Sequence, residues 1–195
     1  MTVYLIRHAQ SESNAVYDPN GPDPMIFDAP ITALGKTQAQ QARIEVEKLD
    51  ISKVIVSPFT RTLQTAQLIF GNKFPFEINS AVREQLCNSC DVGSPPHELA
   101  RKYPHLDFDH LDDCWWHDGK RDYRGLSVEP DENLQKRANR FVDFLKRESI
   151  KSTAIVSHGN FIRALTGIKP HNCEVIEFQL RYSIEKLAFG QSVLF

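Results

Sequence analysis

The sequence predicts an α/β protein, a three-layer α/β/α sandwich around a mostly parallel central sheet. Short apolar runs alternate along the chain with longer segments whose apolar residues recur at helical spacing. Three of these runs pass through a short polar turn directly into a helix, and parallel strands need such helical crossovers. With 195 residues the chain fits one domain, residues 1–195, of ordinary size.

The first half of the chain supplies two strands and two helices. Residues 2–6 are a short apolar run and predict the first strand. Residues 32–49 carry alanine, valine and leucine at helical spacing, and Thr32 is placed to cap this helix. The run KVIV at residues 53–56 predicts the second strand, and residues 59–70 continue from it as a helix.

The second half repeats the pattern. Residues 74–78 predict a short third strand, and residues 132–147 form an amphipathic helix with one apolar face. The run STAIV at residues 152–156 is another apolar strand. The segment SHGNFIRALTG follows it and predicts a turn and a helix, and residues 175–180 offer a last strand.

Composition and charge narrow the class of protein. The apolar share is 41%, the charged share is 25%, and the formal net charge is -2. These values are typical of a globular protein, and they argue against a nucleic acid or a membrane as a partner recognised by bulk charge. The N-terminus lacks the pattern of a signal peptide, and four cysteines are too few for a secreted disulfide framework. We therefore expect a cytoplasmic protein with reduced thiols.

Three segments break the regular pattern: residues 18–30, which are rich in proline, residues 86–130, and the tail after Leu180. Irregular segments longer than about 12 to 15 residues in a compact domain are usually functional. We therefore expect the first two to form the walls or the lid of a site, with residues 86–130 as an inserted lid segment.

Arginine and histidine residues, which can carry positive charge, follow three of the predicted strands. Arg7 and His8 follow the first, Arg61 lies in the first helical turn after the second, and His158 follows the strand at residues 152–156. The carboxyl ends of parallel strands meet at one edge of a sheet, where ligands bind. Two arginines, two histidines and helix N-termini at such an edge predict a phosphate pocket.

The residue types also suggest the chemistry of this pocket. A guanidinium presents a planar fork that matches two phosphate oxygens, and two such forks can neutralise a transferring phosphoryl group. A histidine with an ordinary pKa is largely neutral at pH 7, so its free ring nitrogen can attack phosphorus. No metal ion or other cofactor is then required, because the arginines and the second histidine supply the positive charge.

The segments RHAQSESN, SPFTRTLQTA and SHGNFIRALTG resemble, in order, the three signature segments of the histidine phosphatase superfamily, which includes the cofactor-dependent phosphoglycerate mutases. The resemblance implies a phosphoglycerate mutase-like fold over nearly the whole chain. It implies that His8 becomes phosphorylated and that Arg7, Arg61 and His158 assist. It also implies that the phosphate pocket is lined by Asn14, Gly159 and Asn160. Ala9 departs from the pattern, because the family usually has glycine after the first histidine.

The family also requires an acid that protonates the leaving oxygen. Glu84, in SAVREQLC, stands where the resemblance places it, and we expect burial to raise its pKa. Asp91 and Glu98 are alternatives for this role.

Residues 86–130 carry two further groups of candidates. Trp116, His117 and Arg121, with Lys120 and Arg124 beside them, could contact the substrate from a lid, or they could belong to a packed aromatic segment with a charged rim. Cys87 and Cys90 form a CxxC that could bind zinc together with His110 and Cys114. A single CxxC without a second pair at proper spacing is a weak signal, so we expect no metal site.

These observations favour a phosphomonoester hydrolase that acts through a phosphohistidine on a small phosphorylated metabolite. One alternative is a mutase, although mutases of the family follow the acidic residue with Arg-His-Tyr-Gly, where this chain has residues 85–88, QLCN. Another alternative is an idle module that binds phosphorylated ligands. The sequence leaves the substrate and the oligomeric state open.

Overall fold

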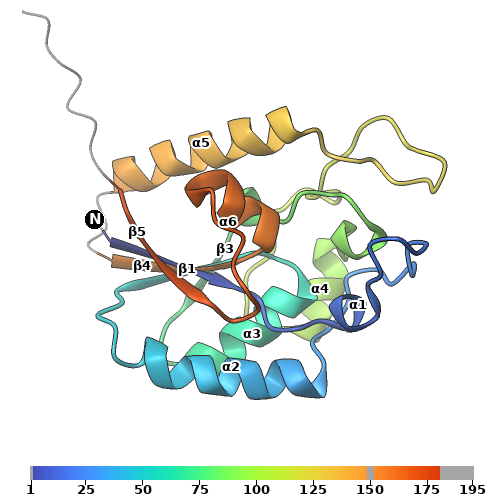
Figure 1. The fold of residues 1–195 in the computed structure, drawn as a ribbon. Coiled ribbons are helices and arrows are strands. Elements are labelled where there is room, and N and C mark those ends of the chain that lie inside the picture. Colours follow the sequence, from blue (N-terminus) through green and yellow to red (C-terminus); the bar gives the residue numbers. More distant parts are fainter. Residues whose placement is uncertain (1, 149–151, 181–195) are drawn as a thin grey trace, which may run out of the picture.

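The computed structural model describes residues 2–148 and 152–180, and these form a five-stranded sheet between two layers of helices (Figure 1). The strand order is β3-β2-β4-β1-β5. All neighbouring pairs are parallel except β1 and β5, which are antiparallel. The strands are β1 (Thr2–Arg7), β2 (Lys53–Val56), β3 (Phe76–Ile78), β4 (Ser152–Ser157) and β5 (Val175–Gln179). The predicted fold class is confirmed.

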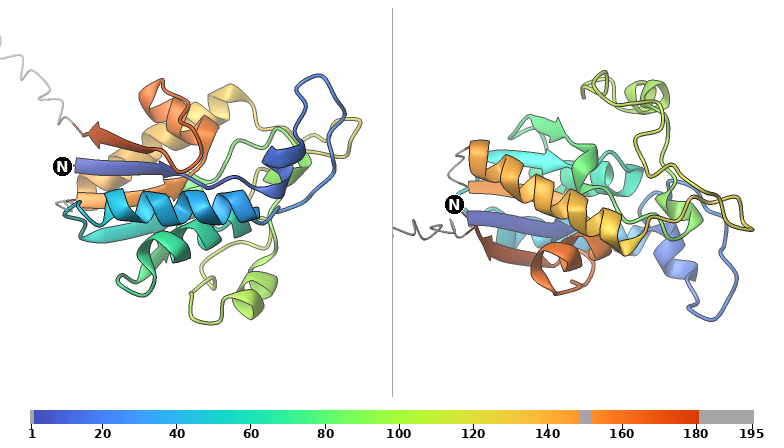
Figure 2. Two further views of the ribbon diagram at one scale, coloured as in Figure 1. Left: turned by 60° about the horizontal axis from the view of Figure 1, so that its bottom comes forward. Right: turned by 90° about the horizontal axis from the view of Figure 1, so that it is seen from above.

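Two pairs of helices cover the two faces of the sheet (Figure 2). On one face, α2 (Ala33–Val46) and α3 (Thr60–Phe70) pack on Ile6, Val54 and Val156. On the other face, α5 (Asp131–Glu148) and α6 (Gly159–Thr166) pack on alternate residues of the same strands. Successive residues of each strand point to opposite faces of the sheet. The same strands therefore contribute side chains to two separate hydrophobic cores, one on each face.

The central strand β1 shows this alternation clearly. Val3 and Leu5 face α5 and α6, Ile6 faces α2 and α3, and all three have no exposed surface. β1 lies between β4 and β5, with Arg7 paired to Ser157 at the carboxyl end of the parallel pair. The residue after β1 is thus held next to the residue after β4.

The boundaries of most predicted elements are close to those observed. Thr32 caps α2 through its side chain, which accepts from the backbone N–H of Gly35. That helix ends at Val46, earlier than the periodicity suggested, and β3 begins at Phe76. The predicted strand at residues 175–180 is confirmed as β5, and the tail beyond it lies outside the described residues.

Four short elements occur where the sequence pattern indicated none. Helix α1 follows β1 and is opened by a capping box between Ser11 and Asn14. Helix α4 lies within the irregular segment 86–130, as does one 3₁₀ turn, and another 3₁₀ turn follows β3. Their bounds are α1 (Glu12–Val16), η1 (Ser80–Val82), η2 (Ser89–Asp91) and α4 (Pro96–Lys102).

The irregular segment 86–130 divides between two places. Its middle part packs beside α3, where Leu99, Phe108 and Trp115 join the core of that face (Figure 2). Its two ends pass the carboxyl edge of the sheet, close to the loop of residues 18–30 (Figure 1). Within this segment, only the residues near its two ends lie close enough to the carboxyl ends of the strands to line a site there. Among the described residues, no helix has the length and apolar character needed to cross a membrane.

Candidate active site

The carboxyl ends of β2, β4 and β1 lie side by side and bring three sequence motifs together. The backbone N–H of His8 donates to Ser157 O at 2.9 Å, and that of Ser57 donates to Val156 O at 3.1 Å. The residues that follow the strands are therefore still fixed by sheet-like hydrogen bonds. Rigid strand ends of this kind hold reactive groups at defined distances, as preorganised sites require.

A cleft of about 430 Å³ opens above these ends. Six of the predicted site residues line it: Arg7, His8, Asn14, Arg61, Glu84 and Asn160. His158 and Gly159 lie directly behind the lining. The His158 ring is fully buried, 5.2 Å from the His8 ring between centroids, and Gly159 packs against the Arg7 guanidinium.

His8 is held in one tautomer. Its Nδ1 lies 2.7 Å from Ala9 O, and a carbonyl can only accept, so Nδ1 carries the proton and Nε2 keeps its lone pair. Burial, followed by the charges of Arg61 and Arg7, holds the pKa of His8 well below its usual value. A neutral imidazole with a free Nε2 is the form that can act as a nucleophile.

Ala9 fits this arrangement without a glycine. Its backbone N–H donates to Thr65 Oγ1 at 3.0 Å, and its methyl group is fully buried. Among the described residues that are not glycine, positive φ occurs only at Met25, Asp28 and Cys173. The backbone at Ala9 is therefore one that alanine adopts without strain.

Arg61 lies in the first turn of α3 and is almost completely buried. Its guanidinium donates to Cys90 O at 2.6 Å and to Asp91 Oδ1 at 3.0 Å, and it lies 4.3 Å from the centroid of the Phe59 ring. Three fixed contacts leave the fork little freedom to move. Arg61 also lines the cleft, where a guanidinium fork matches two phosphate oxygens.

The Arg7 side chain is held by the segment between α6 and β5. Its guanidinium donates to Pro170 O at 2.8 Å, and its buried Nε has no hydrogen-bond partner among the described residues. A Cβ atom at Gly159 would stand 3.4 Å from this Nε and 3.2 Å from Lys169 Cε. Gly159 therefore lies in close contact with the side chains of Arg7 and Lys169 at the N-terminus of α6.

His158 contacts Ser57, Phe59 and His8. Its Nε2 lies 2.8 Å from Ser57 Oγ, and its ring packs edge-on against Phe59 at 5.1 Å between centroids. Its Nδ1 is buried without a partner among the described residues. Burial, followed by the charge of Arg61, lowers the pKa of His158 well below its usual value. A bound phosphate dianion would oppose that charge and favour the imidazolium.

Glu84 lies at the far wall of the cleft. Its carboxyl accepts from the backbone N–H of Gln85 at 2.9 Å and from that of Asn160 at 3.1 Å. Burial, and next the negative charge of Asp91, raise the pKa of Glu84. Asp91 also lines the cleft but accepts from Arg61, Cys87 and Asn88, whereas Glu98 lies in α4 outside the lining.

The three predicted lid contacts do not line the cleft. Trp116 packs edge-on against Trp115, His117 lines a different cavity, and Arg121 is exposed. The segment turns sharply after Arg121, and this turn carries Tyr123 and Arg124 to the cleft instead. The reason is that Trp115 is anchored in the core by its indole N–H, which donates to Ser94 O at 2.9 Å.

Cys87 and Cys90 line the cleft as free thiols. Burial and the charge of Asp91 raise the pKa of each to about 12, so both are protonated and unreactive at neutral pH. Within residues 2–148 and 152–180, no group of three or more histidine, cysteine or acidic side chains is arranged to hold a metal ion.

Comparison with known proteins identifies the family. The model of the histidine phosphatase superfamily (branch 1) matches residues 3–179. The chain belongs to this superfamily. Phosphoglycerate mutase-like protein 1 of Arabidopsis thaliana is 29% identical to it, over 83% of this chain and 69% of the relative. A "probable phosphatase" of Schizosaccharomyces pombe is 26% identical, over 95% and 93%.

Solved structures share the fold of this histidine phosphatase-superfamily chain. Phosphoserine phosphatase of Entamoeba histolytica matches with a TM-score of 0.60 at 20% identity, over 93% of this chain and 91% of that one. Mycobacterial hydrolase 1 matches with a TM-score of 0.62 at 18% identity, over 90% and 89%. The neighbours thus include a phosphatase, and at these identities the likeness shows the fold alone.

Sequence reasoning missed several residues that shape the site of this superfamily member. Asp91 is the buried partner of Arg61, although it was weighed only as an alternative acid. Arg124 was named only beside the predicted lid contacts, and its pairing with Asp23 at 3.3 Å, which joins the loop of residues 18–30 to Cys87 and Asn88, was not foreseen. Lys169 lines the cleft beside Gly159. Such contacts join residues far apart in sequence, and no local pattern marks them.

Proposed function

We propose that this protein is a metal-independent phosphomonoester hydrolase that acts in the cytoplasm on a small phosphorylated metabolite through a phosphohistidine at His8. The observation that carries this proposal is the His8 imidazole. It is neutral, fixed by Ala9 O through Nδ1, and lines a cleft with two arginine forks. The four cysteines, all free thiols, agree with a reducing compartment.

In the first step, the lone pair of His8 Nε2 forms a bond to phosphorus while the bond from phosphorus to the leaving oxygen breaks. Arg7, Arg61 and His158 hold the equatorial oxygens, on which the negative charge is spread. Glu84 is suited to give its proton to the leaving oxygen because its raised pKa keeps the acid form available. The products of this step are an alcohol and phosphohistidine.

In the second step, a water oxygen attacks phosphorus and the bond from phosphorus to His8 breaks. The Glu84 carboxylate takes one proton from the water, which restores the acid. Inorganic phosphate leaves, and His8 returns to the neutral tautomer fixed by Ala9. Asn14 and Asn160 also line the cleft and are available to the phosphate oxygens.

Transfer to water is favoured over transfer to a second hydroxyl by the residues that follow Glu84. They are Gln85, Leu86, Cys87 and Asn88, and the backbone carbonyl of Cys87 accepts from Arg124 at 2.9 Å. This short stretch leads directly into the wall of the cleft and lacks the Arg-His-Tyr-Gly residues with which mutases of the family follow the acidic residue. Named relatives of both kinds exist, so the product must be assayed directly.

The test uses p-nitrophenyl phosphate with and without a chelator. The wild-type protein should hydrolyse it equally in both, and His8→Ala should lose the activity. His97→Ala, at an exposed position on α4, is the matched control and should keep it. Wild-type protein that is denatured during turnover should carry covalently bound phosphate, which is labile to acid and stable to alkali.

Three results would overturn the proposal. Full activity in His8→Ala would exclude this nucleophile. Conversion of 3-phosphoglycerate to 2-phosphoglycerate, without release of phosphate, would indicate a mutase. Binding of phosphate esters with no phosphoenzyme would indicate an idle binding module.

A further inference from the structure

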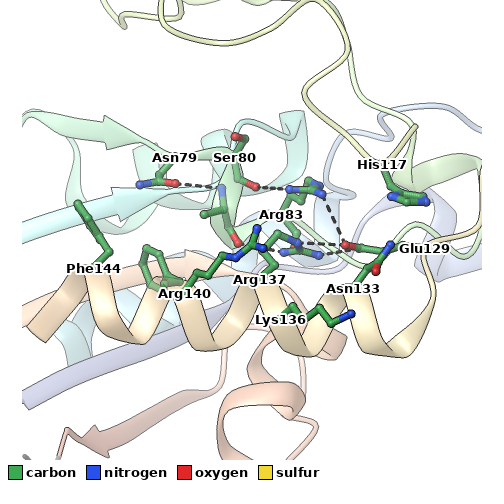
Figure 3. Close-up of a pocket in the computed structure, with 12 residues that line it drawn as sticks. Asn79, Ser80, Arg83, His117, Glu129, Asn133, Lys136, Arg137, Arg140 and Phe144 are labelled. Atoms are coloured by element: carbon green, nitrogen blue, oxygen red, sulfur yellow. Dashed lines mark hydrogen bonds and ion pairs between the residues drawn. The ribbon is translucent and has the colours of Figure 1, made fainter. Parts of the chain in front are cut away.

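A second cavity lies behind the segment that carries Glu84, on the side of the sheet covered by α5 (Figure 3). Its volume is about 670 Å³, which is within the usual range for sites of small organic ligands. Arg83 lines this cavity while the next residue, Glu84, lines the catalytic cleft. The backbone between them is extended, so neighbouring side chains point to opposite sides.

The charge of the cavity is strongly positive. Its lining includes four cationic side chains, Arg83, Lys136, Arg137 and Arg140, and a single carboxylate, that of Glu129. Figure 3 shows three of the cations rising from α5 and Arg83 opposite to them. Four like charges around one cavity repel one another unless an anion lies between them.

Arg137 is already satisfied within the protein. It makes a two-pronged contact with Glu129, at 3.2 Å and 2.6 Å, and it donates to Ala81 O at 2.9 Å and to Arg83 O at 2.8 Å. It also reaches Glu84 O at 3.5 Å. All five of its N–H groups have acceptors. The ion pair of Arg137 and Glu129 therefore holds the backbone of residues 81–84 in place.

The other three cations retain free donors. Arg83 donates to Ser80 O at 3.2 Å and approaches Glu129 at 3.5 Å, but its buried Nε has no partner among residues 2–148 and 152–180. Burial, and next the charge of Arg137, lower the pKa of Arg83 to about 10. Arg140 forms no ion pair within the described chain, and Lys136 has only an exposed one, at 3.7 Å. These groups are available to a ligand.

The cavity has an apolar end as well as a cationic one. Phe144 lies at the opposite end from Glu129 and His117 in Figure 3, with Arg140 between them. Its ring is partly exposed, and Phe141 lies next to it. A ligand that fills the cavity therefore meets a flat aromatic surface at one end and several guanidinium or ammonium groups at the other.

We propose that this cavity is a second ligand site, which binds a molecule with two or more linked phosphate groups attached to a flat ring system, as in a nucleoside diphosphate. The phosphate groups lie between Arg83, Lys136 and Arg140, and the ring packs on Phe144. A bare phosphate would leave the aromatic end empty, and an uncharged ring would leave the cations unpaired. The site is separate from the phosphoryl-transfer chemistry at His8.

The test measures binding of ADP by isothermal titration calorimetry, in the His8→Ala background so that no turnover occurs. Lys136→Ala with Arg140→Ala removes two cations of the cavity. Lys146→Ala with Arg147→Ala removes the same charge from α5 outside the cavity lining and is the matched control. The two lost contacts together are worth about tenfold in affinity or more, because both side chains are exposed to solvent.

We expect the cavity variant to weaken ADP binding at one site by at least about tenfold, and the control pair to change it by less than about twofold. Pyrophosphate and adenosine should each bind more weakly than ADP. Equal weakening in both double variants would mean attraction by bulk charge and would overturn the proposal. Pyrophosphate binding as tightly as ADP would overturn the role of Phe144. Circular dichroism should show the wild-type spectrum for each variant, which excludes misfolding as the cause of any loss.

Discussion

Replacing Glu84 with glutamine tests whether this carboxyl protonates the leaving group. Glu84 Oε1 accepts from the backbone N–H of Gln85 at 2.9 Å and from that of Asn160 at 3.1 Å. Glutamine places an acceptor oxygen of the same size at that position. The variant therefore keeps both hydrogen bonds and the local fold, and it loses the proton that can be transferred.

The size of the effect depends on the leaving group. A positioned general acid contributes about 10²–10⁴-fold, which is about 3–5 kcal/mol of barrier. Phenolate is a strong base and needs the proton, whereas p-nitrophenolate is stable without it. We expect the rate of phosphoryl transfer in Glu84→Gln to fall by about 10²–10⁴-fold with phenyl phosphate and by less than about tenfold with p-nitrophenyl phosphate.

The assay is a single-turnover experiment with enzyme in excess, quenched at short times, for both esters at one pH. Glu98→Gln is the matched control because this residue lies in α4 outside the cleft, and its rates should equal those of the wild type. Equal losses with phenyl and p-nitrophenyl phosphate in Glu84→Gln would refute the assignment, since a structural defect slows both esters alike.

Three further perturbations probe the surroundings of the site. Asp91→Asn removes a charge that raises the pKa of Glu84, so this pKa falls and the alkaline limb of the kcat/KM profile moves to lower pH; an unmoved limb contradicts the coupling. Arg137→Met leaves Glu129 buried without its main partner and costs about 3–5 kcal/mol, or about 6–20 °C in Tm by calorimetry. If adding Glu129→Gln recovers none of this loss, the ion pair is not its cause. Gly93→Ala places a Cβ against the ring of Trp115 and should lower the Tm by about 2–12 °C, from about 1–3 kcal/mol of overpacking; an unchanged Tm excludes the clash.

The sheet, its main helices and the meeting of the three motifs were predictable because local patterns encode them. Apolar runs of four to six residues mark β1, β2 and β4, and each strand is followed by a turn that starts a helix or leads toward one. The parallel crossover rule then places their carboxyl ends at one edge. The order of β4 between β2 and β1 follows from packing and was not visible in the sequence.

The parts that escaped prediction depend on contacts between distant segments. Helix α1 has five residues, too few to show a helical period, and only its capping box between Ser11 and Asn14 signals it. The path of residues 86–130 is set by Trp115, which is buried against Phe59 at 4.7 Å between ring centroids. An aromatic residue in an irregular segment gives no indication of which core it will enter.

The position of β1 in the sheet has a consequence for the order in which the protein folds. Thr2 is paired with Ser152 on one side and with Gln179 on the other, so both neighbours of the first strand are synthesised long after it. Pairings this distant in sequence carry a large loop-closure entropy and form slowly. On the ribosome, β1 therefore waits for its partners until residues 152–179 have emerged, and His8 cannot be fixed against Ser157 before then. Assembly of the nucleophile is therefore a late event, which follows the synthesis of β4 and β5.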